Sequence, residues 1–412
     1  MSASVSTAGR TVRMPSGWRG RIADYASRHR SITIIVGMAL ATSIAPIIVS
    51  LPPFNSFQGL TPWINGFANA GVFVLLALGL NVVVGFAGLL DLGYAAFFAI
   101  GAYTYAYGAS PFTGVHLPFL VLLLVGAFTA AMFGILLGAP TLRLRGDYLA
   151  IVTLGFGEIV PIVFLNLDEW TEGTNGIGGI FRPNFPIIGE FTFGNPWPFY
   201  ILMAVIVTIT MILIYRLQYS RLGRSWAAIR EDELAAASNG LNTVVVKLLA
   251  FALGASTAGL AGVFNASKLT IVSPDQFYFT VSFTVLAMVV LGGMGNPWGV
   301  AVGAFVVYNI QSVLLKQLNT FFDNFNVPIL SDLDFVQYQF LLYGLALVLM
   351  MLLRPEGLFP STRRRRELHV DDDLADEDAA AEVVGALGEV PGAEEDFGEE
   401  THDGPSAGEV GR

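Results

Sequence analysis

Glu158 is the residue of this chain whose position most needs a chemical explanation. It stands in Thr153-Leu154-Gly155-Phe156-Gly157-Glu158-Ile159, deep inside a long apolar run. A carboxyl group is costly in such surroundings unless water or a polar partner reaches it. Two interpretations carry equal weight: Glu158 faces a water-filled path, or it holds two helices together through a hydrogen bond.

Asn81 and Asp91 are two more polar residues that border an apolar segment, one on each side of the short turn 84–90. Asp91 is expected to cap the segment that follows it, at the membrane interface. Asn81 lies one helical turn inside the preceding segment, where a hydrogen bond to another helix is its expected role. Both residues are also candidates for a path or a hinge.

A glycine-rich run, Gly292-Gly293-Met294-Gly295-Asn296-Pro297-Trp298-Gly299, predicts a break between two helices. Broken helices at membrane depth usually line protein or water, so Gly292, Gly293 and Gly295 are further path or hinge candidates. Glycines inside other apolar segments are interpreted as sites of close helix packing. They include Gly134, Gly138, Gly254, Gly259 and Gly262.

Charged residues are concentrated in the stretch 223–240, which lies between two long apolar segments. Within the loop 218–245 it predicts one or two short helices, with Ser225 as N-cap and Gly240 as the stop. A broken apolar stripe (Trp226, Ile229, Leu234, Ala237) beside charged residues favours docking into a groove on a partner protein over a solvated surface loop. The candidate contact residues are Gly223, Arg224, Trp226, Ile229, Arg230, Glu231, Asp232, Glu233, Ala235, Ala236 and Gly240.

Several kinds of enzyme are excluded by motif. A phosphate-binding loop needs Gly directly before Lys, but the three Lys of this chain follow Val246, Ser267 and Leu315. His-Glu-x-x-His and Gly-x-Ser-x-Gly are absent, there is no Cys, and all four His lie outside the apolar segments. We therefore expect a non-enzymatic chain without catalytic residues, metal site or cofactor of its own, and without a nucleic-acid partner.

The elements that position these residues follow from composition. The chain is 54% hydrophobic and 13% charged, whereas a soluble domain carries about 25% charged residues. This predicts an all-α, polytopic integral membrane protein with about ten transmembrane helices (eight to ten). The apolar segments are 31–51, 63–84, 91–108, 117–139, 147–166, 197–217, 246–267, 279–294, 297–317 and 336–353.

Basic residues predict the orientation. With the N-terminus inside, 19 of the 22 Lys and Arg fall on the cytoplasmic side of a ten-span protein, as the positive-inside rule requires. Both termini are then cytoplasmic. Three domains follow: a basic tail 1–30, the membrane domain 31–360 and an acidic tail 361–412 that is expected to be disordered.

The order of these motifs resembles the M-type permease of branched-chain amino acid (Liv) ABC importers. Residues 80–103, 142–159 and 222–240 carry the resemblance. So do Thr174-Asn175-Gly176-Ile177, Val272-Ser273-Pro274, Val290-Leu291-Gly292-Gly293-Met294-Gly295 and Arg354-Pro355-Glu356-Gly357-Leu358. The matching part spans roughly residues 63–360.

The resemblance implies a transmembrane permease subunit for Leu, Ile or Val in the inner or plasma membrane. Its implied partners are a second, related permease, two cytoplasmic ATPases that bind the ATP, and an external solute-binding protein. The stretch 223–240 corresponds to the family's coupling element. Its Glu-Ala-Ala-xxx-Gly signature is matched by Ala235, Ala236 and Gly240, but Leu234 stands where Glu is expected and Glu233 lies one place early.

Two alternatives stay open at this point. One is a permease of urea or short-chain amides in the same family, since the sequence does not reveal the substrate. The other is a secondary transporter that works alone on an ion gradient. That mechanism favours paired charges inside the membrane. Glu158 is the only charged residue found deep inside an apolar segment, and this weighs against a secondary transporter.

Overall fold

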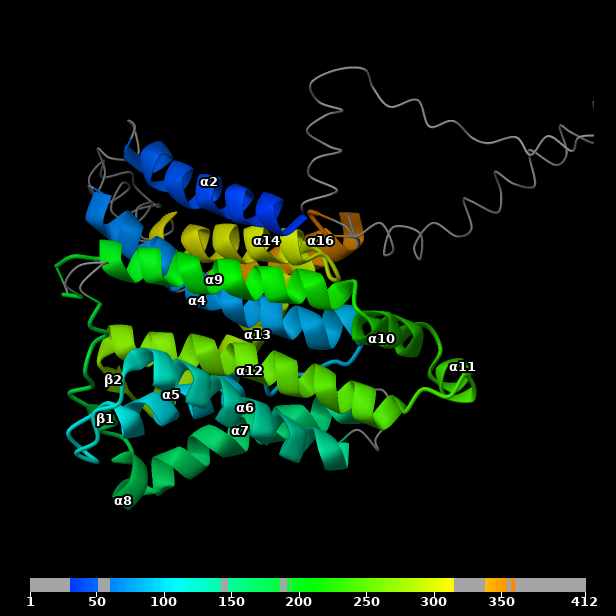
Figure 1. Cartoon of the computed structure of the whole chain (residues 1–412), viewed down its shortest axis with the longest axis horizontal. Coiled ribbons are helices and arrows are strands. Elements are labelled where there is room, and N and C mark those ends of the chain that lie inside the picture. The colour runs from blue at the N-terminus through cyan, green and yellow to red at the C-terminus, as the bar shows by residue number, and fades with distance from the viewer. Residues whose placement is uncertain are drawn as a thin grey trace, which may run out of the picture. The chain divides into compact units, whose positions relative to one another are not determined.

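The computed structural model describes residues 30–50, 60–141, 147–185, 191–192, 194–314, 338–353 and 357–359, all within one compact unit, residues 1–364. This part of the chain is almost entirely helical (Figure 1). Each of the ten predicted apolar segments contains a helix. These are α2 (Arg30–Ser50), α4 (Leu60–Leu80), α5 (Ala95–Gly108), α6 (Phe119–Thr141), α7 (Asp147–Asn166), α9 (Trp197–Gln218), α12 (Thr243–Leu269), α13 (Phe279–Gly292), α14 (Pro297–Asn309) and α16 (Gln339–Leu353).

Seven helical stretches of the described chain are long and apolar enough to cross a membrane. Helices α5, α14 and α16 are shorter, with 14, 13 and 15 residues. Two π-helices extend the bundle, η1 (Asn81–Phe86) after α4 and η3 (Ile310–Leu314) after α14. The protein is an all-α, multi-pass membrane protein.

Short elements lie at the two ends of the helix bundle. Helix α8 (Asp168–Thr171) and the antiparallel strands β1 (Ile177–Gly178) and β2 (Ile271–Val272) lie at one end, which we name the strand end (Figure 1). Helices α10 (Arg221–Glu231) and α11 (Glu233–Ser238) lie at the other, which we name the α11 end. A 3₁₀ turn, η2 (Pro274–Phe277), precedes α13.

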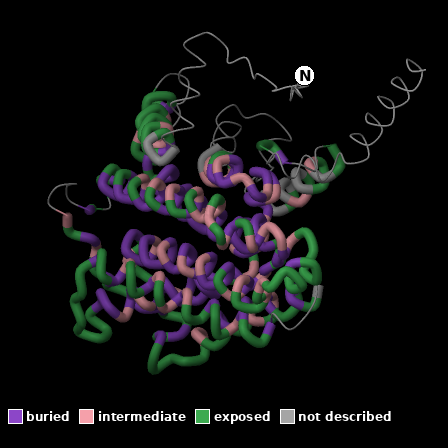
Figure 2. The backbone as a smooth tube through the Cα atoms, turned by 45° about the vertical axis from the view of Figure 1, so that its right-hand side comes forward, coloured by how far each residue is buried: buried purple, intermediate pink, exposed green. Residues whose placement is uncertain are grey.

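Helix α12 packs against α4, α5 and α6, and glycines allow the close approach. A Cβ at Gly259 would lie less than 3.0 Å from the backbone oxygen of Gly126 in α6. A Cβ at Gly101 or Gly262 would meet backbone atoms across the α5–α12 contact equally closely. Buried residues accordingly fill the inside of the bundle (Figure 2). The packing role predicted for Gly259 and Gly262 is confirmed.

Some predicted features lie outside the described residues. These are most of the basic tail 1–30, the acidic tail 361–412, the motif residues 142–146 and the motif residues 354–356.

Candidate functional site

The charged loop folds into two short helices, where one or two were predicted. Helix α10 begins after Ser220, whose hydroxyl accepts a hydrogen bond from the Gly223 amide (3.2 Å). The prediction that Ser225 is the N-cap is wrong, because the helix begins more than one turn earlier. Ser225 lies inside α10, where its hydroxyl donates to the Arg221 carbonyl (3.1 Å).

Asp232 separates the two helices. Its backbone is extended (φ −154°, ψ 110°), so α10 ends here and α11 begins. Its Oδ1 accepts hydrogen bonds from the amides of Leu234 (2.8 Å) and Ala235 (3.0 Å). One carboxylate therefore caps the N-terminus of α11, where both the free amides and the helix dipole favour negative charge.

Gly240 ends α11, as predicted. It adopts φ +82°, and its amide donates to the Ala237 carbonyl (2.9 Å) while the Leu241 amide donates to the Ala236 carbonyl (3.2 Å). This is a Schellman motif, in which glycine is favoured because it tolerates the left-handed conformation.

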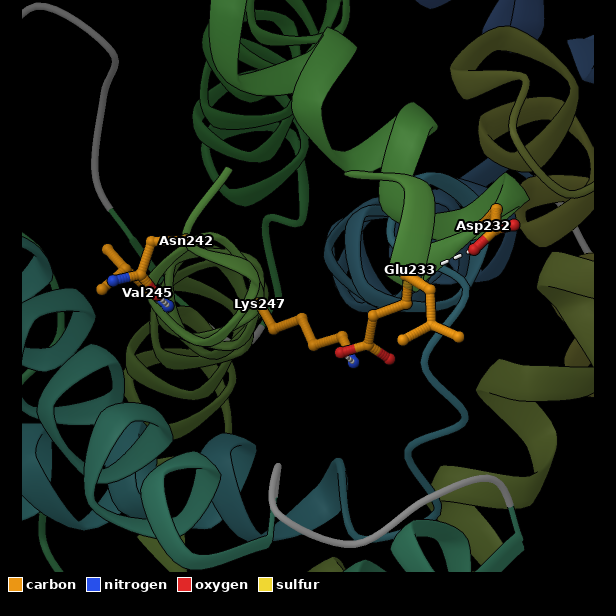
Figure 3. Close-up of polar contacts among 6 residues, drawn as sticks. Asp232, Glu233, Asn242, Val245 and Lys247 are labelled. Atoms are coloured by element: carbon orange, nitrogen blue, oxygen red, sulfur yellow. Dashed lines mark hydrogen bonds and ion pairs between the residues drawn. The ribbon is translucent and has the colours of Figure 1, made fainter. Parts of the chain in front are cut away.

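Helices α10 and α11 are both fixed to α12. Trp226 is fully buried, and its Nε1 donates to the Val246 carbonyl (2.7 Å). Glu233 of α11 forms an ion pair with the buried Lys247 of α12 (2.6 Å), and Figure 3 shows the two side chains meeting between the helices. The contact role of Glu233 that the family signature left in doubt is thus an internal one in this structure.

Arg230 connects α10 to the end of α4. Its guanidinium donates a hydrogen bond to the Gly85 carbonyl in η1. Its aliphatic chain covers Gly88, where a Cβ would lie 2.8 Å from Cγ of Arg230. The partly buried Arg230 therefore belongs to the underside of α10, and not to the surface that a partner protein would meet.

Exposed residues of α10, of α11 and of the link between them form a surface that we name the outward surface. Its members are Glu231, Asp232, Leu234, Ala235 and Ala237, all exposed, and Leu234 is 74% exposed. The predicted apolar stripe is not continuous, because the change of direction at Asp232 turns Trp226 and Ile229 inward. Four candidate contact residues are buried, namely Gly223, Trp226, Ile229 and Ala236, whereas Arg224, Glu231, Asp232, Glu233, Ala235 and Gly240 are exposed.

Asn81 joins η1 to the turn between α13 and α14. Its Oδ1 accepts a hydrogen bond from the Gly295 amide (2.8 Å), so Asn81 bonds to the turn between two helices and not to another helix as expected. The predicted helix break is confirmed, since α13 ends at Gly292 and α14 begins at Pro297.

The position of that break differs from the expectation. Gln218, the last residue of α9, donates to the Gly295 carbonyl (3.4 Å). The turn that contains Gly292, Gly293 and Gly295 therefore lies at the α11 end, beside α9 and η1, and not at mid-depth. Gly293 adopts φ +109°, and a Cβ there would lie 2.5 Å from the Phe359 carbonyl oxygen.

Asp91 does not cap a helix. Helix α5 begins at Ala95, whose amide donates instead to the hydroxyl of Ser282 in α13 (2.9 Å). Asp91 is buried, and its Oδ1 accepts from the Gly93 amide (2.9 Å). The expected capping role is wrong because residues 87–94 run as a non-helical segment, which the Leu92 amide fastens to the hydroxyl of Thr153 in α7 (3.1 Å).

Glu158 lies on α7 and is partly exposed. Among the described residues it forms no hydrogen bond or ion pair. Helix α7 packs against α5 and η2 and leaves Ile151, Gly155 and Ile159 exposed beside Glu158. A bridge from Glu158 to another helix of the described chain therefore has no support, and the path-facing interpretation stays a prediction.

Among the polar contacts that were not predicted from sequence, three involve basic side chains. They are the Arg230–Gly85 bond, the Glu233–Lys247 pair and the contact of Lys268 with Asn69. The two Lys offered a signal, since they are the only charged residues of the long apolar helix α12, one near each end. Backbone acceptors such as Gly85 carry no sequence signal. In the described part of the chain, no group of three or more His, Asp or Glu is placed to hold a metal.

Comparison with known proteins identifies relatives over most of the chain. Residues 63–352 match the model of a family described as the permease component of branched-chain amino acid transport systems. The chain is 42% identical over 317 residues to the high-affinity branched-chain amino acid transport permease LivM of Escherichia coli K12, covering 72% of this chain and 70% of that protein.

More distant relatives include two further permeases. A probable LivM of Methanocaldococcus jannaschii is 26% identical, covering 70% of this chain and 91% of its own. The high-affinity permease LivH of E. coli K12 is 25% identical, covering 62% of this chain and 86% of its own. No solved structure matches the chain.

Proposed function

The chain belongs to the family of branched-chain amino acid transport permeases, and from this premise we propose that it moves Leu, Ile or Val across the inner or plasma membrane as one subunit of an ABC importer. The single observation that carries the proposal is its 42% identity to an LivM over 72% of the chain. The same comparison favours this substrate class over urea or short-chain amides, and a permease subunit over a stand-alone secondary transporter.

The importer would contain four partner chains of three kinds. A second, related permease would complete the membrane part, since LivM and LivH are both relatives of this chain. Two cytoplasmic ATPases would bind the ATP, and an external solute-binding protein would deliver the amino acid. This chain would contribute no catalytic residue.

The proposed orientation places the α11 end in the cytoplasm, together with both termini. Basic residues support it, since Arg216, Arg221, Arg224, Arg230 and Lys247 lie on or beside α10 and α11. Acidic residues Asp168, Glu169 and Glu172 lie at the strand end. Positively charged segments remain cytoplasmic during membrane insertion.

The contacts of α10 and α11 give a route for coupling. A partner ATPase would bind the outward surface and move both helices. Because Trp226 and Glu233 fix them to α12, and Arg230 fixes α10 to η1, the motion would pass into the bundle. From η1 it would reach the α13–α14 turn through the bond between Asn81 and Gly295.

Reconstitution tests the proposal. The chain should be purified with its genomic neighbours for a second permease, two ATPases and a binding protein, and placed in proteoliposomes. Leucine-loaded binding protein outside and ATP inside should give leucine accumulation. A non-hydrolysable ATP analogue should give none. Uptake that proceeds without ATP on an ion gradient would refute the proposal.

Glu158→Gln is expected to lower leucine uptake while the assembled transporter survives. The substitution keeps the shape of a partly exposed side chain but removes its charge from α7, where it would face the path. We expect a loss of about tenfold, the effect of about 1.4 kcal/mol. Initial uptake rates should be measured at equal amounts of assembled complex, with Asn166→Asp on the same helix as a control for altered charge. Unchanged rates for Glu158→Gln would return the residue to a packing role.

A further inference from the structure

Lys268 is a buried cation at the strand end that the coupling route does not use. It lies in the last turn of α12, and the residue is 9% exposed. Its Nζ donates hydrogen bonds to the Asn65 carbonyl (3.2 Å) and to Oδ1 of Asn69. Both acceptors belong to the first turns of α4 and both are uncharged.

No carboxylate of the described residues forms an ion pair with Lys268. Lys247 provides the comparison, because it is equally buried in the same helix and is paired with Glu233 at 2.6 Å. Burial of a charge is expensive without a countercharge. The C-terminal dipole of α12 favours a cation, but this effect is small beside the desolvation of a whole ammonium group. An anionic partner would offset this cost and hold the Lys268 side chain in its charged form.

A cavity of about 120 Å³ adjoins this ammonium group. Asn69, Thr192 and Lys268 give it polar walls, and Phe199 and Leu269 give it apolar ones. At about 30 Å³ for each water, the cavity is equivalent to roughly four water molecules. It therefore has room for a carboxylate and the carbon atoms next to it, but not for a whole leucine.

We propose that this cavity, the Lys268 pocket, binds the carboxylate group of the transported amino acid where it enters the permease. Two of the three Nζ protons of Lys268 are used within the chain, and the third is available for a carboxylate oxygen. The Oδ1 of Asn69 accepts from Lys268, and its amide nitrogen carries two protons, of which one serves the Tyr308 hydroxyl and the other supplies a second donor. Phe199 and Leu269 supply apolar surface for the first carbons of the side chain.

The location of the pocket agrees with this assignment, which rests on the proposed function. In the proposed orientation the strand end faces outward, so the pocket meets an amino acid when the binding protein releases it. A charge-assisted hydrogen bond recognises the carboxylate, which is common to Leu, Ile and Val. Selectivity among side chains would remain with the binding protein.

Binding to the purified permease in detergent tests the pocket directly. The probes are leucine, isovalerate, which is valine without its amine and keeps the carboxylate, and isoamylamine, which is leucine without its carboxylate and keeps the amine. Isothermal titration calorimetry should show binding of leucine and isovalerate and none of isoamylamine. Lys268→Gln should weaken isovalerate binding at least about tenfold, as the loss of one hydrogen bond to a charged group requires. Lys268→Arg keeps a charged donor for the carboxylate and should retain isovalerate binding within about threefold.

Three controls accompany this experiment. Thermal unfolding of each variant shows that the fold is intact, and Lys268→Arg measures the effect of altering the site without removing its charge. Lys247→Gln removes an equally buried amine at the far end of α12 and should leave isovalerate binding unchanged. Equal binding of isovalerate by folded Lys268→Gln and wild type would overturn the proposal, as would binding of isoamylamine as tightly as isovalerate.

The pocket and the proposed function can fail separately. If the complete importer takes up leucine but the permease shows no isovalerate binding that depends on Lys268, the pocket is wrong and the function stands. If the permease binds isovalerate through Lys268 but the complete importer moves no branched-chain amino acid, the proposed function is wrong and the anion site stands.

Discussion

Leu234→Asp is expected to reduce ATP-driven leucine uptake by at least about thirtyfold, the effect of losing roughly 2 kcal/mol at a central contact. Leu234 is the most exposed large apolar residue of α10 and α11, and it projects from the outward surface. A carboxylate there would have to be desolvated in the groove of an ATPase. Initial uptake into proteoliposomes and ATPase activity stimulated by the binding protein should fall together.

The controls for Leu234→Asp separate docking from folding. Leu234→Met keeps an apolar side chain of similar volume and should keep most of the uptake. Val244→Asp places the same charge at another exposed position of the α11 end, outside the outward surface, and should change uptake less than about twofold. Wild-type uptake by Leu234→Asp would show that the outward surface does not dock.

Reversal of the charges at Arg230 and Glu231 would be a less specific test of the same idea. The guanidinium of Arg230 bonds to the Gly85 carbonyl, so its replacement alters the attachment of α10 to η1. Loss of uptake in that double variant could come from lost docking or from lost transmission into the bundle. Leu234→Asp changes only an exposed side chain, so it tests docking alone.

Gly259→Leu is expected to prevent folding of the membrane domain. Its side chain would enter the contact between α12 and α6, where a Cβ alone would lie less than 3.0 Å from the Gly126 oxygen and from Cβ of Ala130. The Gly126 backbone cannot relieve the clash by a change of rotamer, as a flexible side chain can. Overpacking of well-packed interiors costs about 1–3 kcal/mol and more where the neighbours are rigid, so we expect little folded protein.

Size-exclusion chromatography of detergent extracts would measure this effect as the yield of monodisperse protein. Gly155→Leu is the matched control, because Gly155 also lies within an apolar helix but a Cβ added there, on the exposed side of α7, would meet no atom within 4 Å. It should give a yield near that of wild type. Equal yields for Gly259→Leu and wild type would contradict the packing described for α12.

The sequence allowed the helices to be predicted, because the apolar segments that cross a membrane are long and their polar borders are sharp. The ends of the helices were less predictable. Ser225 and Ser220 are equally good N-caps by residue type, and the packing of Gly223 on the end of α9 favours the earlier one. Asp91 was misinterpreted because Ser282, distant in sequence, takes over the start of α5.

The candidate site was predictable in place but not in orientation. Charge concentration located α10 and α11, and the glycine at position 240 located the end of α11. Helical periodicity assumes one continuous axis, so it could not predict that the extended backbone at Asp232 would place Trp226 and Leu234 on opposite sides. The inward turn of Arg230 depends on a backbone carbonyl of η1, which no pattern of residue types reveals.

The central position of α12 also has a consequence for synthesis of the protein. Helices α4, α5 and α6 are made before the helix that they pack against, and α12 ends 128 residues after α6 does. At about 5–20 residues per second, synthesis of α12 is completed roughly 6–26 s after that of α6, and the glycine-lined surface of α5 is without its partner for longer still. During that interval lipid or an insertion chaperone has to cover the glycine-lined surfaces of α5 and α6, and the ribosome-bound chain is the stage most exposed to misassembly.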